Sequence, residues 1–201
     1  MAVGNSSNAA FYNISNGKIC RQFKSPTKDS KERVNMNGKT VHEEHYDYID
    51  GIITDIQIRD GDYGKSWNIN LDDDGQQQVL QMPYSSGYSN SFLKTLPNVD
   101  LNSKVKLIPK LTVENDKKKT TLFVNQNGSA IKWAFTKDHP GDLPQLKQIK
   151  VKGKITWDDS DLMEFLENMV KNDILPQLKK VDTKVAVEAG DNPDELEDAP
   201  F

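Results

Sequence analysis

The sequence predicts a mainly β protein built around a β-barrel, and three features support this prediction. Runs in which apolar and polar residues alternate recur between residues 46 and 135, and a period of two is typical of half-buried strands. Turns rich in Gly and Asp separate the runs, and Gly51 interrupts the first run, as expected where a barrel strand bends. A stretch of helical spacing, residues 85–96, lies within the series.

The order of these elements narrows the fold. We expect three strands, then a short helix over residues 85–96 that ends at Pro97, and then further strands. This order is that of an oligonucleotide/oligosaccharide-binding (OB) barrel, and a β-sandwich with a similar number of strands is the alternative. The expected strands span residues 46–59, 65–71, 78–84, 104–114, 120–125 and 131–135.

Further elements flank the expected barrel. Asn16-Gly17 and Asn37-Gly38 predict two β-hairpins before it, because Asn-Gly pairs adopt the positive φ angles of tight turns. Residues 148–157 predict one more strand, and Asp158 is suited to cap a helix with one apolar stripe. The predicted organisation is a disordered N-terminus (1–10), an OB-fold domain with N-terminal hairpins (11–157), one C-terminal helical segment (158–181) and a disordered acidic tail (182–201).

Composition indicates an ordinary soluble chain. Its 201 residues are 35% hydrophobic and 28% charged, enough for one core with appendages. No apolar run is long enough to span a bilayer, and the first residues lack the pattern of a signal peptide. The single cysteine, Cys20, excludes an internal disulfide and fits a reducing compartment, so we expect a cytoplasmic protein.

The net charge of −4 combines two regions of opposite sign. Residues 1–157 hold 22 Lys/Arg and 17 Asp/Glu, a balance of +5, whereas residues 158–201 hold 4 and 13, a balance of −9. A basic body with an acidic terminal segment suggests a surface that binds a polyanion and a tail that competes for it.

Two rows of lysines suggest where a polyanion would bind. Along residues 104–111 the lysines occupy one face and the aliphatic residues the other, and residues 149–152 alternate in the same way. Such a row is commonly just a solvated face. With Arg59, Lys65 and Lys117–Lys119 at strand ends, however, the rows predict a groove that follows a phosphate backbone.

Single-strand binding also needs flat rings on which bases stack. The candidates are Tyr46, Tyr48, Tyr63, Trp67, Tyr84, Tyr88, Phe123 and Trp133, of which we expect about half in the core. Tyr63, Tyr84 and Tyr88 lie in or beside turns and are the rings expected to be exposed. The predicted DNA-binding residues are Arg59, Tyr63, Lys65, Trp67, Asn68, Tyr84, Tyr88, Lys104, Lys106, Lys110, Phe123, Lys150 and Lys152.

The acidic sequence at the end of the chain predicts a contact with a partner protein. From Glu188 onward there are six acidic residues and no basic one, too polar a run to fold alone. The ring and carboxylate of the terminal Phe suit an apolar pocket rimmed by Arg or Lys on a partner, although a merely solubilising terminus is the alternative. The predicted partner-binding residues are Asp194, Glu195, Glu197, Asp198, Pro200 and Phe201.

Other chemistry finds little support in the sequence. His42 and His45 would point to opposite faces of a strand, which disfavours a shared metal ion. Asp72-Asp73-Asp74-Gly75 resembles the start of a calcium loop but lacks its spacing and closing Glu, so a hairpin turn is expected. No nucleophile with a base and no phosphate-binding Gly-rich loop is present, so we expect neither an enzyme, a metal nor a cofactor.

The barrel pattern of residues 46–111 and the tip formed by residues 197–201 resemble phage-encoded single-stranded DNA-binding proteins. The similar runs include Tyr-Gly-Lys-Ser-Trp-Asn-Ile-Asn-Leu and the terminal Glu-Asp-Ala-Pro-Phe, and together they cover about half the chain. The tip departs from the bacterial form at Ala199, where Ile is common. The hairpins are not part of the bacterial barrel, so its tetramer is not implied and a monomer or dimer is expected.

The resemblance implies sequence-independent binding and protection of single-stranded DNA during phage replication or recombination. It also implies that the tip recruits replication proteins and competes with DNA for the groove. Two alternatives stay open, a recombination factor that anneals strands and a structural or interaction module that does not bind DNA.

Overall fold

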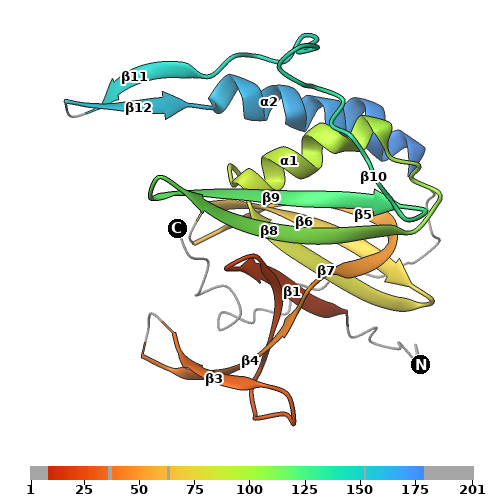
Figure 1. Cartoon of the computed structure of the whole chain (residues 1–201). Helices are drawn as coiled ribbons and strands as arrows, with labels where there is room; N and C mark the ends of the chain where they lie inside the picture. The colour runs from red at the N-terminus through yellow and green to blue at the C-terminus, as the bar shows by residue number, and fades with distance from the viewer. Residues whose placement is uncertain (1–8, 36–37, 63, 152, 179–201) are drawn as a thin grey trace, which may run out of the picture.

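The computed structural model describes residues 9–35, 38–62, 64–151 and 153–178 (Figure 1). A ten-stranded mixed sheet dominates it, with the strand order β10-β9-β8-β5-β6-β7-β1-β2-β4-β3, and β11 and β12 form a separate two-stranded sheet. The prediction of a mainly β protein is confirmed. The strands are β1 (Ala10–Ser15), β2 (Lys18–Phe23), β3 (Lys31–Val34), β4 (Thr40–Tyr46), β5 (Ile49–Gly61), β6 (Gly64–Asp73), β7 (Gln76–Pro83), β8 (Val105–Glu114), β9 (Lys117–Gln126), β10 (Ser129–Ala130), β11 (Lys147–Val151) and β12 (Lys154–Asp158).

Two short helices complete the fold. Helix α1 (Gly87–Thr95) is followed by a 3₁₀ turn (Leu96–Asn98) that contains Pro97, close to the predicted end of this helix. Helix α2 (Ser160–Met169) continues into a π turn (Val170–Ile174) and a second 3₁₀ turn (Leu175–Gln177). None of the helices in the described ranges is long and apolar enough to cross a membrane.

The pairing of β5 with β6 at the centre of the sheet depends on alternating apolar residues in β6 and on Gly51 in β5. In β6 the side chains of Trp67, Ile69 and Leu71 are buried on one face, as their spacing predicts. A Cβ atom on Gly51 would lie 2.9 Å from the Asp72 carbonyl oxygen, so β5 and β6 approach too closely there for a side chain. A register shift between residues 53 and 55 then bends β5, in agreement with the predicted interruption of this strand.

The strands of the N-terminal hairpins are hydrogen-bonded into the large sheet and do not form a separate one. Strand β1 pairs with β7 in parallel, with Phe11 opposite Val79, and β2 pairs with β4. Both turn residues of the first hairpin, Asn16 and Gly17, have positive φ, and a Cβ on Gly17 would lie 2.9 Å from the Leu111 backbone nitrogen. The hairpin tip therefore packs against β8. Among the described residues no hydrogen-bonded ladder joins β7 to β9, so the sheet is open in its strand pairing.

The helices cover one face of the sheet, as Figure 1 shows. Helix α1 packs against β9 so closely that a Cβ atom on Gly87 would clash with the Thr120 hydroxyl. In α2 the predicted apolar stripe is buried at Leu162, Leu166 and Met169. Residue Asp159, not Asp158, is the N-cap of α2, while the Asp158 carboxylate accepts a hydrogen bond from the Ser160 backbone (3.0 Å).

Three strand predictions are corrected. Residues 148–157 form a hairpin rather than one strand, because Gly153 (φ +83°) allows the chain to turn between β11 and β12. The region predicted as a strand at 131–135 is irregular, and only β10 precedes it. The β8–β9 turn falls at Asn115-Asp116, both with positive φ, so Lys117–Lys119 lie in β9 and not in the turn.

Candidate nucleic-acid interface

The outward face of the β8–β9 hairpin gathers basic and apolar side chains. In β8, Val105 and Leu107 are buried, and Lys106 and Lys110 alternate with the buried positions and point away from the core. The register places Ile108 opposite Phe123, whose ring is 41% exposed. We call this face, together with the adjoining Tyr48, the β8–β9 surface. Its members are Tyr48, Lys106, Ile108, Lys110, Thr112, Lys117, Lys119, Thr121, Phe123 and Asn125.

Tyr48 extends the surface onto a third strand. It directly precedes Ile49, which pairs with Leu107 of β8, and its ring is 46% exposed. The Lys106 ammonium lies 3.9 Å from the centre of the Tyr48 ring, a cation–π contact. Tyr48, Ile108 and Phe123 therefore form a row across adjacent strands, with a lysine already bound to one ring.

The charge of this surface is mainly positive. Lys106, Lys110, Lys117 and Lys119 share the face, and within the described ranges none of the four forms an ion pair. Glu114 at the turn and Asp50, opposite Lys106 on β5, are the nearby acids in the strand register. Unpaired ammonium groups beside exposed rings suit a ligand with flat bases and phosphates.

Some aromatic residues predicted to stack on bases lie in the core or pack against it instead. Trp67 is 1% exposed and stacks on Tyr84, with ring centres 5.6 Å apart and planes 3° apart. The Tyr84 hydroxyl donates a hydrogen bond to the Glu167 carboxylate of α2 (2.7 Å), and burial together with this bond raises the pKa of Tyr84. Helix α2 therefore covers part of the ring, and Tyr84 is half-buried rather than exposed as expected.

Tyr88 and Asn68 are also less accessible than predicted. Tyr88 is 7% exposed because it belongs to α1 and packs into the core, and burial raises its pKa. Its expected exposure is wrong. Asn68 is 5% exposed at the centre of β6. A position beside a turn in the sequence thus does not show whether an aromatic ring is exposed or covered by a helix.

The other predicted basic residues are spread over the fold. Lys104 forms ion pairs with Asp73 (2.8 Å) and Asp74 (2.9 Å), which raise its pKa, and the two carboxylates offset its positive charge. Lys65 lies 5.6 Å from the Tyr84 ring, at the end of the β5–β6 pair where Arg59 also lies. Lys150 is in β11, away from β8. Tyr63, Lys152 and the predicted tail residues (Asp194, Glu195, Glu197, Asp198, Pro200 and Phe201) lie outside the described residues.

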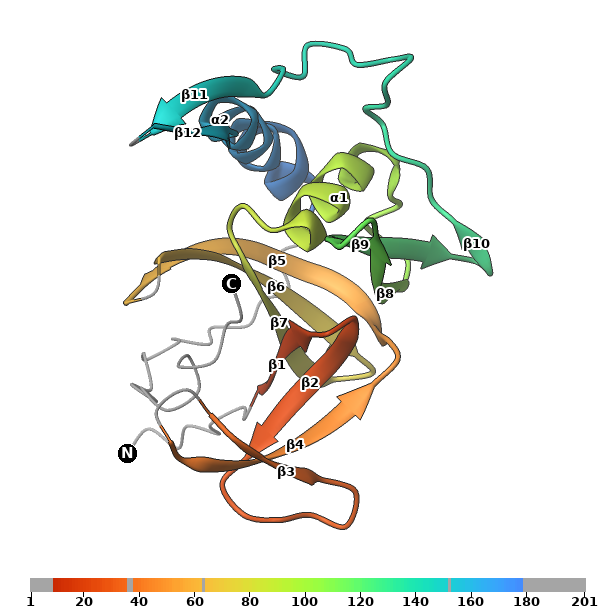
Figure 2. The same ribbon diagram turned by 60° about the vertical axis from the view of Figure 1, so that its left-hand side comes forward.

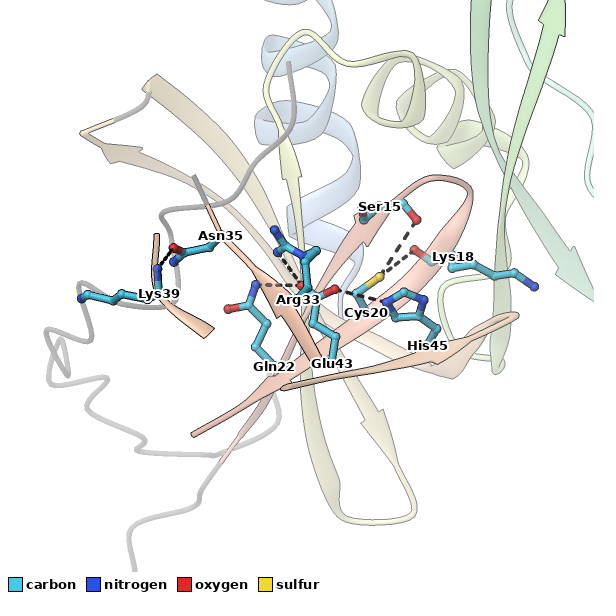
Figure 3. Close-up of polar contacts among 9 residues, drawn as sticks. All are labelled: Ser15, Lys18, Cys20, Gln22, Arg33, Asn35, Lys39, Glu43 and His45. Atoms are coloured by element: carbon cyan, nitrogen blue, oxygen red, sulfur yellow. Dashed lines mark hydrogen bonds and ion pairs between the residues drawn. The ribbon is translucent and has the colours of Figure 1, made fainter. Parts of the chain in front are cut away.

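A separate polar cluster joins strands β2, β3 and β4 around Glu43 (Figure 3). The buried Glu43 carboxylate accepts hydrogen bonds from Arg33 (2.6 Å), Gln22 (3.1 Å) and His45 (3.2 Å). Burial favours the neutral acid, but the bonds from Arg33, His45 and Gln22 outweigh it and lower the Glu43 pKa. Three side chains thus satisfy the buried Glu43 carboxylate, which indicates a structural role.

The cluster shows no arrangement for metal binding or nucleophilic chemistry. His42 faces Glu32 of β3 at 3.9 Å, whereas His45 contacts Glu43, and no three metal-ligating side chains gather in the part of the chain that the structure describes. Cys20 is buried, and burial raises the pKa of its thiol to about 11, which keeps it protonated at neutral pH.

Sequence reasoning partly missed the aromatic row. Tyr48 is one of the eight candidate rings but is absent from the predicted DNA-binding residues, and alternation alone gives no reason to include Ile108. The signal was present in the Asn115-Asp116 turn, because a two-residue turn fixes the register that places Ile108 opposite Phe123.

The comparisons with known proteins add no relative. No protein-family model matches the chain, and neither the curated proteins nor the solved structures contain a match. The function must therefore be argued from the residues and their geometry.

Proposed function

We propose that the protein binds single-stranded DNA without sequence preference and that the β8–β9 surface is its principal contact. The observation that supports this most is the row of Tyr48, Ile108 and Phe123, flanked by the unpaired ammonium groups of Lys106 and Lys110. Adjacent strands lie about 4.8 Å apart, so the two rings, about two strand spacings apart, leave room for a base on each.

The fold supports the same proposal. The order of β5, β6, β7, α1, β8 and β9, with β5 paired to both β6 and β8, is the order of an OB barrel. We propose that these elements form an OB-like barrel whose gap between β7 and β9 is occupied by the β1–β2 hairpin. In OB folds the loops that correspond to the β5–β6 and β8–β9 turns contact oligonucleotides, which gives Arg59, Lys65 and Lys117–Lys119 a place beside the DNA.

Binding would proceed by stacking and charge neutralisation. Bases stack on Tyr48 and Phe123, and each stack contributes about 1–3 kcal/mol whatever the base, since every base has a π face. Lys106 exchanges its contact with the Tyr48 ring for a phosphate, which frees the ring face for a base. Lys110, Lys117 and Lys119 contact further phosphates and release counterions, so affinity falls as salt rises.

Removal of the two rings tests the proposal. Replacing Tyr48 and Phe123 singly by Leu keeps apolar bulk but removes the stacking face, so each variant should bind labelled oligo-dT about 5- to 100-fold more weakly. Fluorescence anisotropy measures the affinity, and circular dichroism checks that the fold is intact. The control is Phe11→Leu, since this ring is 48% exposed on β1, outside the surface. Equal affinities for all four proteins would contradict the assignment of the site.

A further inference from the structure

A groove of about 540 Å³ lies along the other side of β9. Helix α1, the segment before β11 and strand β12 form its walls, and Figures 1 and 2 show these elements together on the helical side of the sheet. The lining residues that matter here are Lys94, Lys119, Thr121, Trp133, Leu146 and Trp157.

Two tryptophan rings from distant parts of the sequence line this groove. Trp133 is 40% exposed and Trp157 is 59% exposed. The backbone on both sides of Trp133 is fixed, because Ile131 donates a hydrogen bond to the Val124 carbonyl and Ala134 donates one to the Lys94 carbonyl (both 2.8 Å). Exposed rings of this size, one of them on a fixed backbone, are stacking surfaces with little conformational entropy to lose.

Lysine side chains in the groove favour the binding of an anionic ligand. The Lys94 side chain is half-buried and forms no hydrogen bond or ion pair within the described ranges, and burial lowers its pKa. Lys119 adds a second ammonium group, and Asp159 is the acid that lines the groove. On the β11–β12 hairpin, Lys150 pairs with Ile155 on the same face as Trp157, which extends the basic and aromatic lining outward.

The groove is continuous with the β8–β9 surface. Lys119 and Thr121 belong to both, because this part of β9 is the edge of the sheet and has no further strand beside it in the described pairing. A DNA strand bound at Phe123 therefore reaches the groove by passing over the free edge of β9.

We propose that the groove binds a second stretch of the same DNA single strand, which crosses the edge of β9 and stacks its bases on Trp133 and Trp157. This inference rests on the proposed function and extends its binding site. The two broad flat rings and the continuity with the first surface favour a nucleic acid over an acidic peptide, which would use the charges but not the rings.

The positions of the tryptophans allow a direct test. The chain has three tryptophans, and Trp67 is buried, so quenching of tryptophan fluorescence reports occupancy of the groove. Anisotropy of a labelled oligo-dT reports binding anywhere on the protein. We expect oligo-dT of about six nucleotides to bind with little quenching and oligo-dT of about 15 nucleotides to bind more tightly with strong quenching, within the range of OB-fold site sizes.

A double variant, Trp133→Leu with Trp157→Leu, should weaken binding of the longer oligonucleotide at least about tenfold and leave the shorter one unchanged. Trp133→Phe with Trp157→Phe should abolish the quenching but retain most of the affinity, since a phenyl ring still stacks. Phe11→Leu is the control and should behave as the wild type for both lengths.

Each other outcome has a defined meaning. An anisotropy increase with equal affinity for both lengths and no quenching overturns the inference and leaves the proposed function intact. Without any anisotropy change the proposed function fails, and the inference fails with it. If oligo-glutamate quenches the tryptophan fluorescence and the longer oligo-dT does not displace it, the inference is overturned in favour of an acidic peptide.

Discussion

Glu43 illustrates what single residues contribute to this fold. It is the one charged residue that is buried among the described positions, and its carboxylate joins side chains from β2, β3 and β4. The low pKa of Glu43 means that the folded state favours the ionised form. This stabilisation is present above the ordinary carboxyl pKa of 4.5 and is lost as the pH falls below it.

Glu43→Gln should therefore change both the free energy of unfolding and its dependence on pH. At pH 7 the substitution should lower the free energy of unfolding by about 1–3 kcal/mol, since it weakens charge-assisted hydrogen bonds in a buried site. The Arg33 side chain is 40% exposed, so solvent screens part of this effect. Between pH 5 and pH 3 the wild type should lose more stability than the variant.

Urea unfolding at a series of pH values measures this difference. Glu32→Gln on β3 is the control, because the Glu32 side chain is 72% exposed whereas that of Glu43 is 6% exposed. Parallel curves for wild type and Glu43→Gln would show that Glu43 does not link stability to pH.

At the scale of elements, local patterns predicted local structure well. The alternation in β6 and β8, the Asn16-Gly17 turn and the apolar stripe of α2 all match the structure, because each depends on residues close in sequence. The parallel pairing of β1 with β7 and the cover that α2 places over Tyr84 join residues far apart in the chain. Such contacts have no local signature, which is why the sequence predicts exposed rings for Tyr84, which is half-buried, and Tyr88, which is buried.

The same limit explains the partial prediction of the candidate site. Lys106, Lys110 and Phe123 were selected from alternation alone, and the register of the hairpin brings them together. Selection of Tyr48 required the pairing of Ile49 with Leu107, which links strands separated by a meander and a helix. The groove brings α1, β9 and β12 together, so no single stretch of sequence indicates it.

At the scale of the whole molecule, the basic body and the acidic C-terminal segment carry opposite charge. We propose that the tail recruits replication proteins through its Pro-Phe end and competes with DNA for the basic surfaces. Deletion of residues 188–201 should then tighten oligo-dT binding at low salt and have little effect at high salt, because screening weakens the competition.

Anisotropy titrations of the full chain and the deletion variant at two salt concentrations measure this effect. A variant in which the acidic residues from 188 to 198 are replaced by Gln or Asn keeps the tail length and controls for its bulk. Equal affinity of the full chain and the deletion at low salt would exclude competition by the tail.

The central claim is that the β8–β9 surface neutralises DNA phosphates, and the salt dependence of oligo-dT affinity tests it most directly. For an oligo-dT of about six nucleotides, whose phosphates contact the four lysines of the β8–β9 surface, a plot of log affinity against log salt should have a slope of about −3 for the wild type. Lys106→Glu with Lys110→Glu should weaken binding on every sequence alike and bring the slope to about −1.5, whereas Lys31→Glu on β3 should change neither. Binding that is absent or independent of salt, or a double variant indistinguishable from the wild type, would contradict the account.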